Sequence, residues 1–305
     1  MKSSLTILAG MLAATLAIAA PALARDVTHA MGVTDVPEAP LRIVALTNEA
    51  AEDLVALGIV PVGAARSANS DPWYDYLSTD LASAVVTGEE LAPDLEAIAV
   101  LQPDLILGNK RRHEKIYDQL SAIAPTVFAE SIQGTWKANL TLYAEAAGKP
   151  AEGAALLAGY QVRLEQIRAE LGDRVNEDIS VVRFLAGQSY AYFPASFSGS
   201  VLADIGFGRP EAQNGEGLAE LITKERIGEL AADRILYFTY ETGDGLAINE
   251  GESWMAEPLW QNLEAAKAGQ VYGVSDAVWA TAGGFMAAQL ALDDIETIFA
   301  LPPTR

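Results

Sequence analysis

Short apolar runs alternate with segments of helical periodicity along most of the chain. Residues 42–47 are mainly apolar, which is typical of a strand buried on both faces of a sheet. Residues 49–57 have helical apolar spacing, and Gly58 is a typical helix end. The same alternation predicts further strands at 61–64, 85–88, 105–108 and 126–128 and helices at 94–101 and 113–123. Short strands alternating with helices favour a parallel sheet covered on both faces, and the polar stretch 25–39 predicts an edge hairpin.

The middle of the chain has a different pattern. Residues 136–147 predict a helix that ends at Gly148, and Pro150 suits the first turn of the next helix. Residues 151–171 then predict one uninterrupted helix. At about 1.5 Å per residue it would extend roughly 30 Å, the width of a small domain.

After Gly172 the alternation resumes. It predicts strands at 181–185, 190–193, 235–240 and 271–274, and helices at 199–205, 223–230, 258–268 and 284–301. Short segments echo one another across the middle, such as LVALG at 54–58 and LADIG at 202–206. These repeats support two similar α/β lobes joined by a single helix.

The N-terminus predicts an export signal over residues 1–24. Lys2 precedes an apolar run over 5–20, and Ala22-Leu-Ala24 is a small-x-small site that places cleavage before Arg25. A membrane anchor is less favoured, because the run is shorter than the ~20 residues that span a bilayer. The sequence has no cysteine, which excludes disulfides and an acyl anchor on cysteine. We therefore expect a protein free in the periplasm, without a membrane anchor.

The 305-residue chain is acidic, with 41 Asp and Glu against 20 Lys and Arg and a formal charge of −21. Such a field repels nucleic acid and anionic lipid, so nucleic acid is not an expected partner. An anionic solute would need a local positive group in its binding site.

Sequence motifs of catalysis are absent. The two histidines, His29 and His113, lie far apart, and there is no HExxH, G-x-S-x-G or Walker motif. Gly206-Phe-Gly208 lacks the third glycine of a dinucleotide-binding loop. These observations predict a protein that is not an enzyme and has no intrinsic metal or cofactor.

Two long stretches resemble the siderophore and cobalamin binding proteins of ABC importers. They are Pro93–Leu107, PDLEAIAVLQPDLIL, and Arg112–Thr126, whose initial Arg-His pair is similar to the ferric citrate and ferric hydroxamate branch. The resemblance extends over nearly the whole chain after the signal, with further matches at 196–202, 206–210, 258–260 and 279–284.

The resemblance implies two α/β lobes with parallel sheets, bridged by one long helix in a class III solute-binding fold. The expected divisions are 25–149 for the first lobe, 150–172 for the bridging helix and 173–305 for the second lobe. It also implies a monomer that captures a ferric siderophore in the interlobe cleft and delivers it to an inner-membrane permease with its ATPase.

A chelated ferric ion needs a site of aromatic walls and a few cationic or hydroxyl donors rather than metal ligands. Arg112 falls where the family motif places a binding arginine, and a surface charge is the alternative. Tyr190 and Tyr192 would share one face of a strand, and Trp279 matches a cleft tryptophan of the family. A core position is the alternative for all three rings. Weaker candidates are Trp73, Tyr76, Tyr240 and Trp254, and His113 is expected to be structural.

Two departures from the family pattern bear on the ligand. Glu90 stands where relatives that bind carboxylate-rich chelates often carry arginine, and a second arginine expected near Tyr190 is not found close by in the sequence. The sequence therefore favours a less anionic ferric hydroxamate, or a complex with a cationic arm that meets Glu89 or Glu90, over ferric citrate.

Glu114 and Glu225 match the acidic positions that dock each lobe of the family on the permease. Ion pairs at the rim with permease arginines would orient the complex, while a solvated helix charge is the alternative for each glutamate. Three other functions remain open at this point: cobalamin or haem binding, a periplasmic α/β enzyme, and an adaptor that binds a partner protein.

Overall fold

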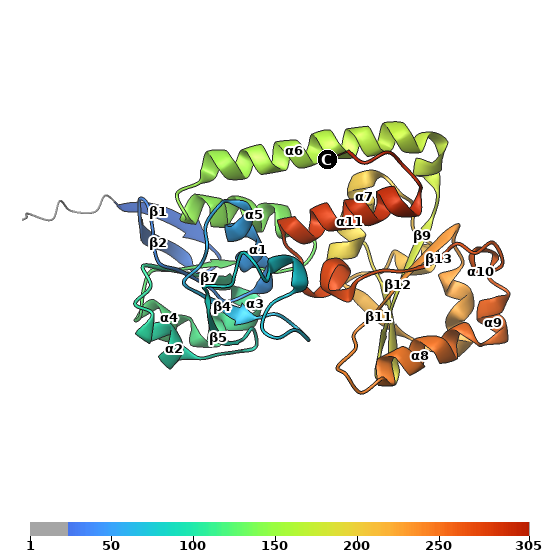
Figure 1. Ribbon diagram of the computed structural model, residues 1–305, viewed down its shortest axis with the longest axis horizontal. Helices are drawn as coiled ribbons and strands as arrows, with labels where there is room; N and C mark the ends of the chain where they lie inside the picture. Colours follow the sequence, from blue (N-terminus) through green and yellow to red (C-terminus); the bar gives the residue numbers. More distant parts are fainter. Residues whose placement is uncertain (1–23, 305) are drawn as a thin grey trace, which may run out of the picture.

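The computed structural model describes residues 24–304. The signal peptide predicted over 1–24 lies outside these residues, apart from Ala24. The described chain forms two sheets covered by helices, with one long helix across both (Figure 1). This arrangement confirms the predicted two-lobed α/β fold.

The first lobe is built on a six-stranded sheet in the order β6-β5-β4-β3-β7-β8. All neighbours are parallel except β5 and β6. A separate antiparallel hairpin of β1 and β2 confirms the predicted edge hairpin. The strands are β1 (Ala24–His29), β2 (Gly32–Pro37), β3 (Ile43–Ala45), β4 (Gly63–Arg66), β5 (Val85–Glu89), β6 (Ala92–Pro93), β7 (Leu105–Asn109) and β8 (Thr126–Ala129).

The second lobe is built on a five-stranded sheet in the order β11-β10-β9-β12-β13. Strands β9, β12 and β13 are parallel, whereas β10 is antiparallel to both of its neighbours. The sheet thus departs from the expected parallel pattern, because Gly187 with φ +69° makes a tight turn between β9 and β10. The strands are β9 (Ile179–Leu185), β10 (Gln188–Tyr192), β11 (Ala219–Ile222), β12 (Arg234–Thr239) and β13 (Val271–Gly273).

The α-helices cover the faces of both sheets. They are α1 (Asn48–Ala56), α2 (Leu95–Val100), α3 (Lys110–His113), α4 (Tyr117–Ser121), α5 (Trp136–Ala146), α6 (Pro150–Leu171), α7 (Phe197–Ile205), α8 (Leu246–Met255), α9 (Pro258–Gln261), α10 (Glu264–Lys267) and α11 (Phe285–Ile298). Short 3₁₀ segments are η1 (Asp75–Leu77), η2 (Glu114–Ile116), η3 (Gly172–Asn176), η4 (Glu211–Gln213) and η5 (Lys224–Leu230), and η6 (Ala277–Thr281) is a π-helix. Helix α6 confirms the predicted long helix, whereas the helices predicted over 113–123 and 258–268 are each interrupted.

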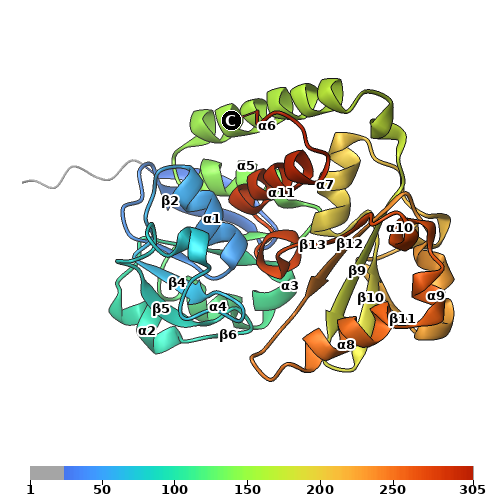
Figure 2. The same ribbon diagram turned by 45° about the vertical axis from the view of Figure 1, so that its right-hand side comes forward.

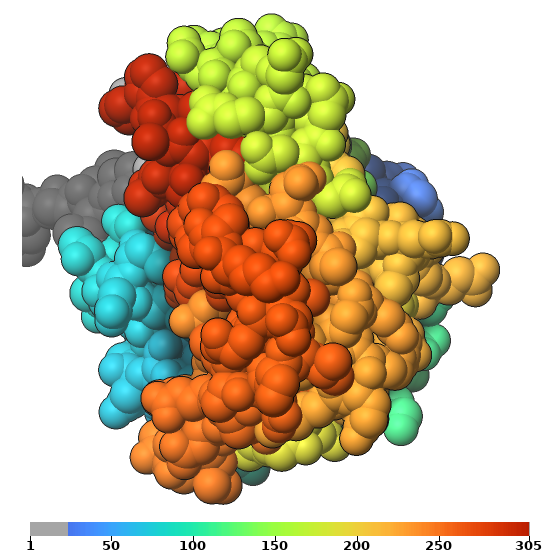
Figure 3. Space-filling model, turned by 90° about the vertical axis from the view of Figure 1, so that its right-hand side faces the viewer, coloured from blue at the N-terminus to red at the C-terminus, as the bar shows by residue number. Residues whose placement is uncertain are grey.

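Helix α6 spans the two lobes. It packs on α5 of the first lobe and on α7 of the second, and α11 lies beneath it between the lobes (Figures 1 and 2). Seen from outside the second lobe, α6 is viewed end-on at the top of the molecule, above the orange segment that contains α8 and α9 (Figure 3). The bridge is therefore one rigid element rather than a pair of flexible strands.

A single buried cluster continues through both lobes. Its centre is Trp136 of α5, which is fully buried. The indole lies 5.1 Å from the ring of Tyr160 on α6, 6.3 Å from Phe197 on α7 and 6.4 Å from Phe285 on α11, measured between centroids. Close-packed cores resist continuous deformation, so this shared core limits how far the lobes can move relative to one another.

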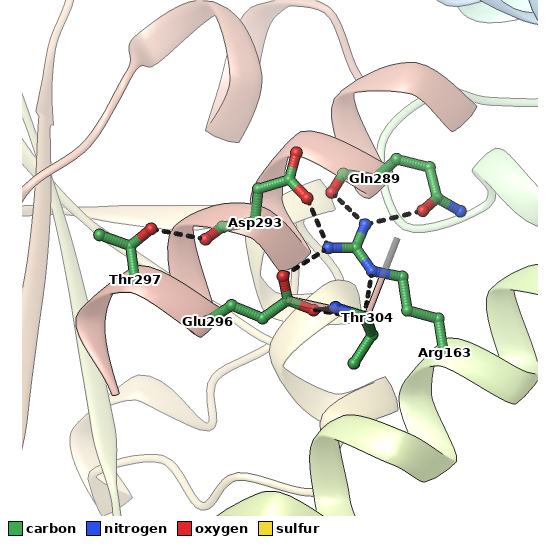
Figure 4. A network of polar contacts seen from close by, with 6 residues as sticks. All are labelled: Arg163, Gln289, Asp293, Glu296, Thr297 and Thr304. Atoms are coloured by element: carbon green, nitrogen blue, oxygen red, sulfur yellow. Dashed lines mark hydrogen bonds and ion pairs between the residues drawn. The ribbon is translucent and has the colours of Figure 1, made fainter. Parts of the chain in front are cut away.

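A buried polar network fixes α6 to the C-terminal part of the chain (Figure 4). Arg163 of α6 donates to Gln289 through Nη1 and to Thr304 Oγ1 through Nε, at 2.8 and 2.9 Å. Its Nη2 lies 2.5 Å from Asp293 and 3.1 Å from Glu296. Because all the donors of this guanidinium have partners, its burial carries little penalty. These contacts join α6, α11 and Thr304 into one unit.

Among residues 24–304, no helix combines the length and the apolar character that crossing a bilayer requires.

Candidate functional site: the interlobe cleft

A cavity of about 940 Å³ lies between the two lobes. The first lobe contributes the ends of β4 and β5 with the loops that follow them, the first residue of α1, Arg112 of α3 and Gln133. The second lobe contributes β9, the segment after β12 and the end of η6. Ligands of α/β sheets bind at the carboxyl ends of parallel strands, and this cavity has that position. Its lining residues include Asn48, Arg66, Asn69, Glu89, Glu90, Arg112, Gln133, Arg183, Tyr240, Glu241 and Thr281.

A second hollow of about 460 Å³ adjoins the first. Arg183 and Leu185 line both hollows. Tyr190 and Tyr192 line the second hollow together with Arg111. The two tyrosines lie two residues apart on β10, as expected for side chains on one face of a strand. The cleft therefore consists of a polar main cavity and a side compartment that contains the two tyrosines.

Arg112 is held in the main cavity by the local structure of α3. Asn109 ends β7, and its Oδ1 accepts a hydrogen bond from the backbone N–H of Arg112 at 2.9 Å. The guanidinium forms an ion pair with Glu90, and 24% of the Arg112 side chain is exposed. Burial lowers the pKa of Arg112, while the charge of Glu49 acts in the opposite direction. The predicted binding arginine is thus in the cleft, with an acidic partner from its own lobe.

His113 has a structural role beside this pair. Its Nδ1 accepts a hydrogen bond from the N–H of Asn109, and its Nε2 therefore donates to the carbonyl of Glu90 at 2.8 Å. Burial lowers the pKa of His113 to about 4, with a smaller effect from the charge of Arg112. The neutral imidazole joins the end of β7 to the loop after β5 and does not line either hollow.

Like Arg66, Arg183 is a cleft residue that sequence reasoning missed. It lies directly opposite Tyr190 in the β9–β10 ladder. Its guanidinium binds Asp276 through two contacts of 2.6 and 2.9 Å and donates to the hydroxyl of Tyr192 at 3.0 Å. The ring of Tyr240 lies 4.8 Å from its Cζ. The expectation that no second arginine stands near Tyr190 is therefore wrong, because the residue arrives from the neighbouring strand.

Each of the three arginines that line the main cavity pairs with a carboxylate of the chain. Arg112 pairs with Glu90 and Arg183 with Asp276, as described above. Arg66 lies 2.5 Å from Asp71 and 3.3 Å from Glu89. Four carboxylates, those of Asp71, Glu89, Glu90 and Glu241, line the cavity beside the three guanidinium groups, so none of these arginines is an uncompensated positive charge.

The predicted tryptophan walls are not found in the cleft. Trp279 is fully buried, and its indole N–H donates to Asp294 of α11 at 2.7 Å. Trp73 is also buried in the shared core. Trp254 packs in a separate core of the second lobe and donates to Glu250 at 2.8 Å. All three indoles are buried in a core, where their large apolar rings are removed from water. The predictions that placed Trp279, Trp73 and Trp254 in the cleft are therefore wrong.

The remaining predicted aromatic residues divide between the cleft and the core. Tyr240 lines the main cavity, as predicted. The hydroxyl of Tyr76 instead donates to Glu52, a fully buried carboxylate of α1. The aromatic surface of the cleft is therefore tyrosine rather than tryptophan, and tyrosine offers a hydroxyl together with its ring.

Three carboxylates of α1 are buried beneath the cleft. Burial raises the pKa of Glu49 and of Asp53 well above the usual range and raises the pKa of Glu52 to about 7. Asp53 accepts from the backbone N–H of Phe285 at 3.1 Å, and Glu52 accepts from that of Ala287 at 3.4 Å. Helix α11 has only Gly284 as its own N-cap, so α1 of the first lobe caps it. The cap joins the two lobes directly under the cavity floor.

The two predicted docking glutamates are both on the surface. Glu114 begins η2 in the first lobe, and Glu225 is in η5 of the second lobe. Both residues are exposed. Among residues 24–304, no group of three or more His, Cys, Asp or Glu side chains is arranged to hold a metal ion.

Two α/β lobes, a single helical bridge and a polar interlobe cleft define a solute-binding protein. The chain belongs to the periplasmic binding protein family, whose pattern matches residues 43–277. The family consists of binding proteins, which supports a role without catalysis.

Several relatives match over nearly their whole length. A probable siderophore-binding lipoprotein of Bacillus subtilis is 50% identical over 90% of this chain and 87% of its own. The achromobactin-binding periplasmic protein of Dickeya dadantii is 33% identical over 85% of this chain and 86% of its own. The crystal structure of Staphylococcus aureus SirA complexed with staphyloferrin B is 33% identical and has a TM-score of 0.85, over 91% of this chain and 99% of that one.

Proposed function

We propose that the protein captures a ferric siderophore in the interlobe cleft and delivers it to an ABC permease and its ATPase in the inner membrane. The observation that carries the proposal is a cavity of about 940 Å³ whose wall offers the guanidinium groups of Arg66, Arg112 and Arg183. Guanidinium groups bind the oxygen-rich edge of a chelate through paired hydrogen bonds. The names of relatives that are 33% and 50% identical support the same class of ligand.

The side compartment would hold the apolar part of such a ligand. Tyr190 and Tyr192 supply rings, and Tyr240 supplies a third at the junction of the two hollows, next to Arg183. We further propose residues 25–149 and 173–305 as the two lobes of an exported, monomeric periplasmic protein, with 150–172 as the bridge between them.

A ligand panel tests this function. The purified protein is titrated with ferric dicitrate, ferric hydroxamates, ferric catecholates, haem and cobalamin, and tryptophan fluorescence and the melting temperature are followed. We expect saturable quenching and a raised melting temperature with at least one ferric siderophore, since a ligand specific for the native state stabilises it. Saturation by haem or cobalamin alone, or by no member of the panel, would contradict the proposal.

Docking on the permease is tested by charge reversal. We expect Glu114→Arg combined with Glu225→Arg to reduce uptake to the background level, because the rim ion pairs that orient the complex become repulsive. Ligand affinity should stay unchanged, since neither glutamate lines the cleft. The measurement is transport of the bound ferric chelate in cells with the permease and ATPase.

The matched control reverses two exposed glutamates of the bridging helix, Glu165→Arg and Glu170→Arg. This pair changes the net charge by the same amount and should transport normally. Equal loss of uptake in both double variants would show that overall charge, and not the docking positions, is responsible.

A further inference from the structure

Glu90 lies in a site that would suit an anion from a ligand. One oxygen, Oε1, accepts hydrogen bonds from the backbone N–H of Asn48 at 2.5 Å and from its side-chain amide at 2.7 Å. The other oxygen pairs with the guanidinium of Arg112. A helix N-terminus, an amide and a guanidinium are the donors that proteins use to bind carboxylates. The chain thus fills this group of donors with a carboxylate of its own.

The backbone around Glu90 is fixed. Glu90 is in the turn between β5 and β6, after Gly88, whose φ of +92° favours glycine. The carbonyl of Glu90 accepts a hydrogen bond from His113 at 2.8 Å. Only 12% of the Glu90 side chain is exposed, compared with 57% for Glu89. The carboxylate is therefore positioned by the fold and does not reach Arg112 by chance.

We propose that Glu90 is a specificity-determining residue that competes with the ligand for Arg112, and this inference rests on the proposed function. A polyanionic chelate that takes the guanidinium must displace Glu90 or accept a carboxylate close to its own charges. A buried carboxylate without its partner is costly. A chelate of low charge, or one with a protonated amine, avoids that repulsion and is attracted by Glu90.

The other arginines of the cavity point to the same class of ligand. Arg66 and Arg183 also have carboxylate partners within the chain. Among the described residues that line the main cavity, Glu90 is the carboxylate that combines strong burial with a contact to the predicted binding arginine. The cleft therefore selects a ferric siderophore that carries a positive group or little net charge.

The test compares Glu90→Gln with Glu89→Gln, a neighbouring glutamate of the same cavity that is more exposed. The dissociation constants of ferric dicitrate, a polyanion, and ferrioxamine B, a ferric hydroxamate with a protonated amine, are measured for each protein. We expect Glu90→Gln to shift the ratio of the two constants toward ferric dicitrate by about tenfold or more. The Glu89→Gln control should shift it less than about threefold, because exposed charges are screened.

A ratio that does not change in Glu90→Gln, or that changes equally in both variants, would overturn the inference. Glu90→Ala is measured in parallel, since it removes the same charge and should shift the ratio in the same direction. Melting temperatures confirm that each variant is folded. Failure of the wild-type protein to bind any ferric chelate would instead contradict the proposed function, so the two failures are distinguishable.

Discussion

Between pH 5 and pH 8 the protein is expected to lose about 2–3 kcal/mol of unfolding free energy through Glu52 alone. Burial raises the pKa of this carboxyl to about 7 in the folded state, from its usual value of 4.5. The folded state therefore holds a proton that the unfolded state has released. The penalty is absent below the unfolded pKa, grows as the pH rises, and is complete above pH 7.

The hydrogen bonds that Glu52 accepts act against the effect of burial on its pKa. Tyr76 donates to one oxygen and the N–H of Ala287 to the other, which partly offsets the effect of burial. Glu49 and Asp53 lie on the same helix, and burial raises the pKa of each. Gly284 of the second lobe packs so closely that a Cβ there would overlap the carboxylate of Glu52. Water therefore has little access to this cluster.

The measurement is urea unfolding at pH 5, 6, 7 and 8 for the wild type, Glu52→Gln and Glu165→Gln. An acidic protein also loses stability with rising pH through repulsion between its charges, so the difference between variants is the relevant quantity. Glu52→Gln should remove about 2–3 kcal/mol of the pH dependence, while the exposed Glu165→Gln should leave it unchanged. Parallel pH profiles for wild type and Glu52→Gln would rule out the buried carboxylate as the cause.

Hydrophobic periodicity predicted most of the strands of the two lobes and the helix that joins them. The strands at 42–47 and 105–108 are recovered as β3 and β7, and the helix at 151–171 as α6. These segments are strongly periodic and buried, so local pattern and tertiary packing agree. Helix α8 was not predicted because Asn249 and Gly251 weaken its propensity. The backbone N–H groups of Gly245 and Ile248 donate to Glu241, which stabilises the start of this helix.

The candidate site was only partly predictable. Arg112 lies within a sequence motif, and the structure brings it to the cleft together with Glu90. Arg183 lies seven residues before Tyr190, and only the pairing of two strands brings it opposite that tyrosine. A one-residue change of register would place it on the other face of the sheet. Which residues face one another across the β9–β10 hairpin therefore depends on the position of the turn at Gly187, and the apolar pattern did not define that position.

Tryptophan was the least reliable guide to the cleft. A large ring near a family motif suits either a ligand wall or a core, and sequence alone does not separate these roles. Trp279 is in a π-helix whose last residues, Ala280 and Thr281, line the cavity while its own ring points into the core. The π-helical backbone of residues 277–281 decides which of their side chains face the cavity and which face the core.

Replacing Arg112 by alanine is expected to weaken binding of the preferred ferric siderophore by about 100-fold. The substitution removes the donor that would contact the anionic edge of the chelate. It also leaves the carboxylate of Glu90 with only the donors of Asn48, so a repulsive charge remains in the cavity. Arg112→Lys should give an intermediate loss, because an ammonium group cannot form the paired hydrogen bonds of a guanidinium.

Fluorescence titration of the preferred siderophore measures this effect, with Lys110→Ala as the matched control. Lys110 is two residues away on the same helix and pairs with Glu130 at 3.2 Å, and it does not line either hollow. Adding Glu90→Gln to Arg112→Ala should recover part of the lost affinity, since it removes the carboxylate that has lost its partner. The change in binding free energy of the double variant should therefore differ from the sum of the changes in the two single variants. Binding within about threefold of the wild type in Arg112→Ala would exclude this arginine from the ligand contact.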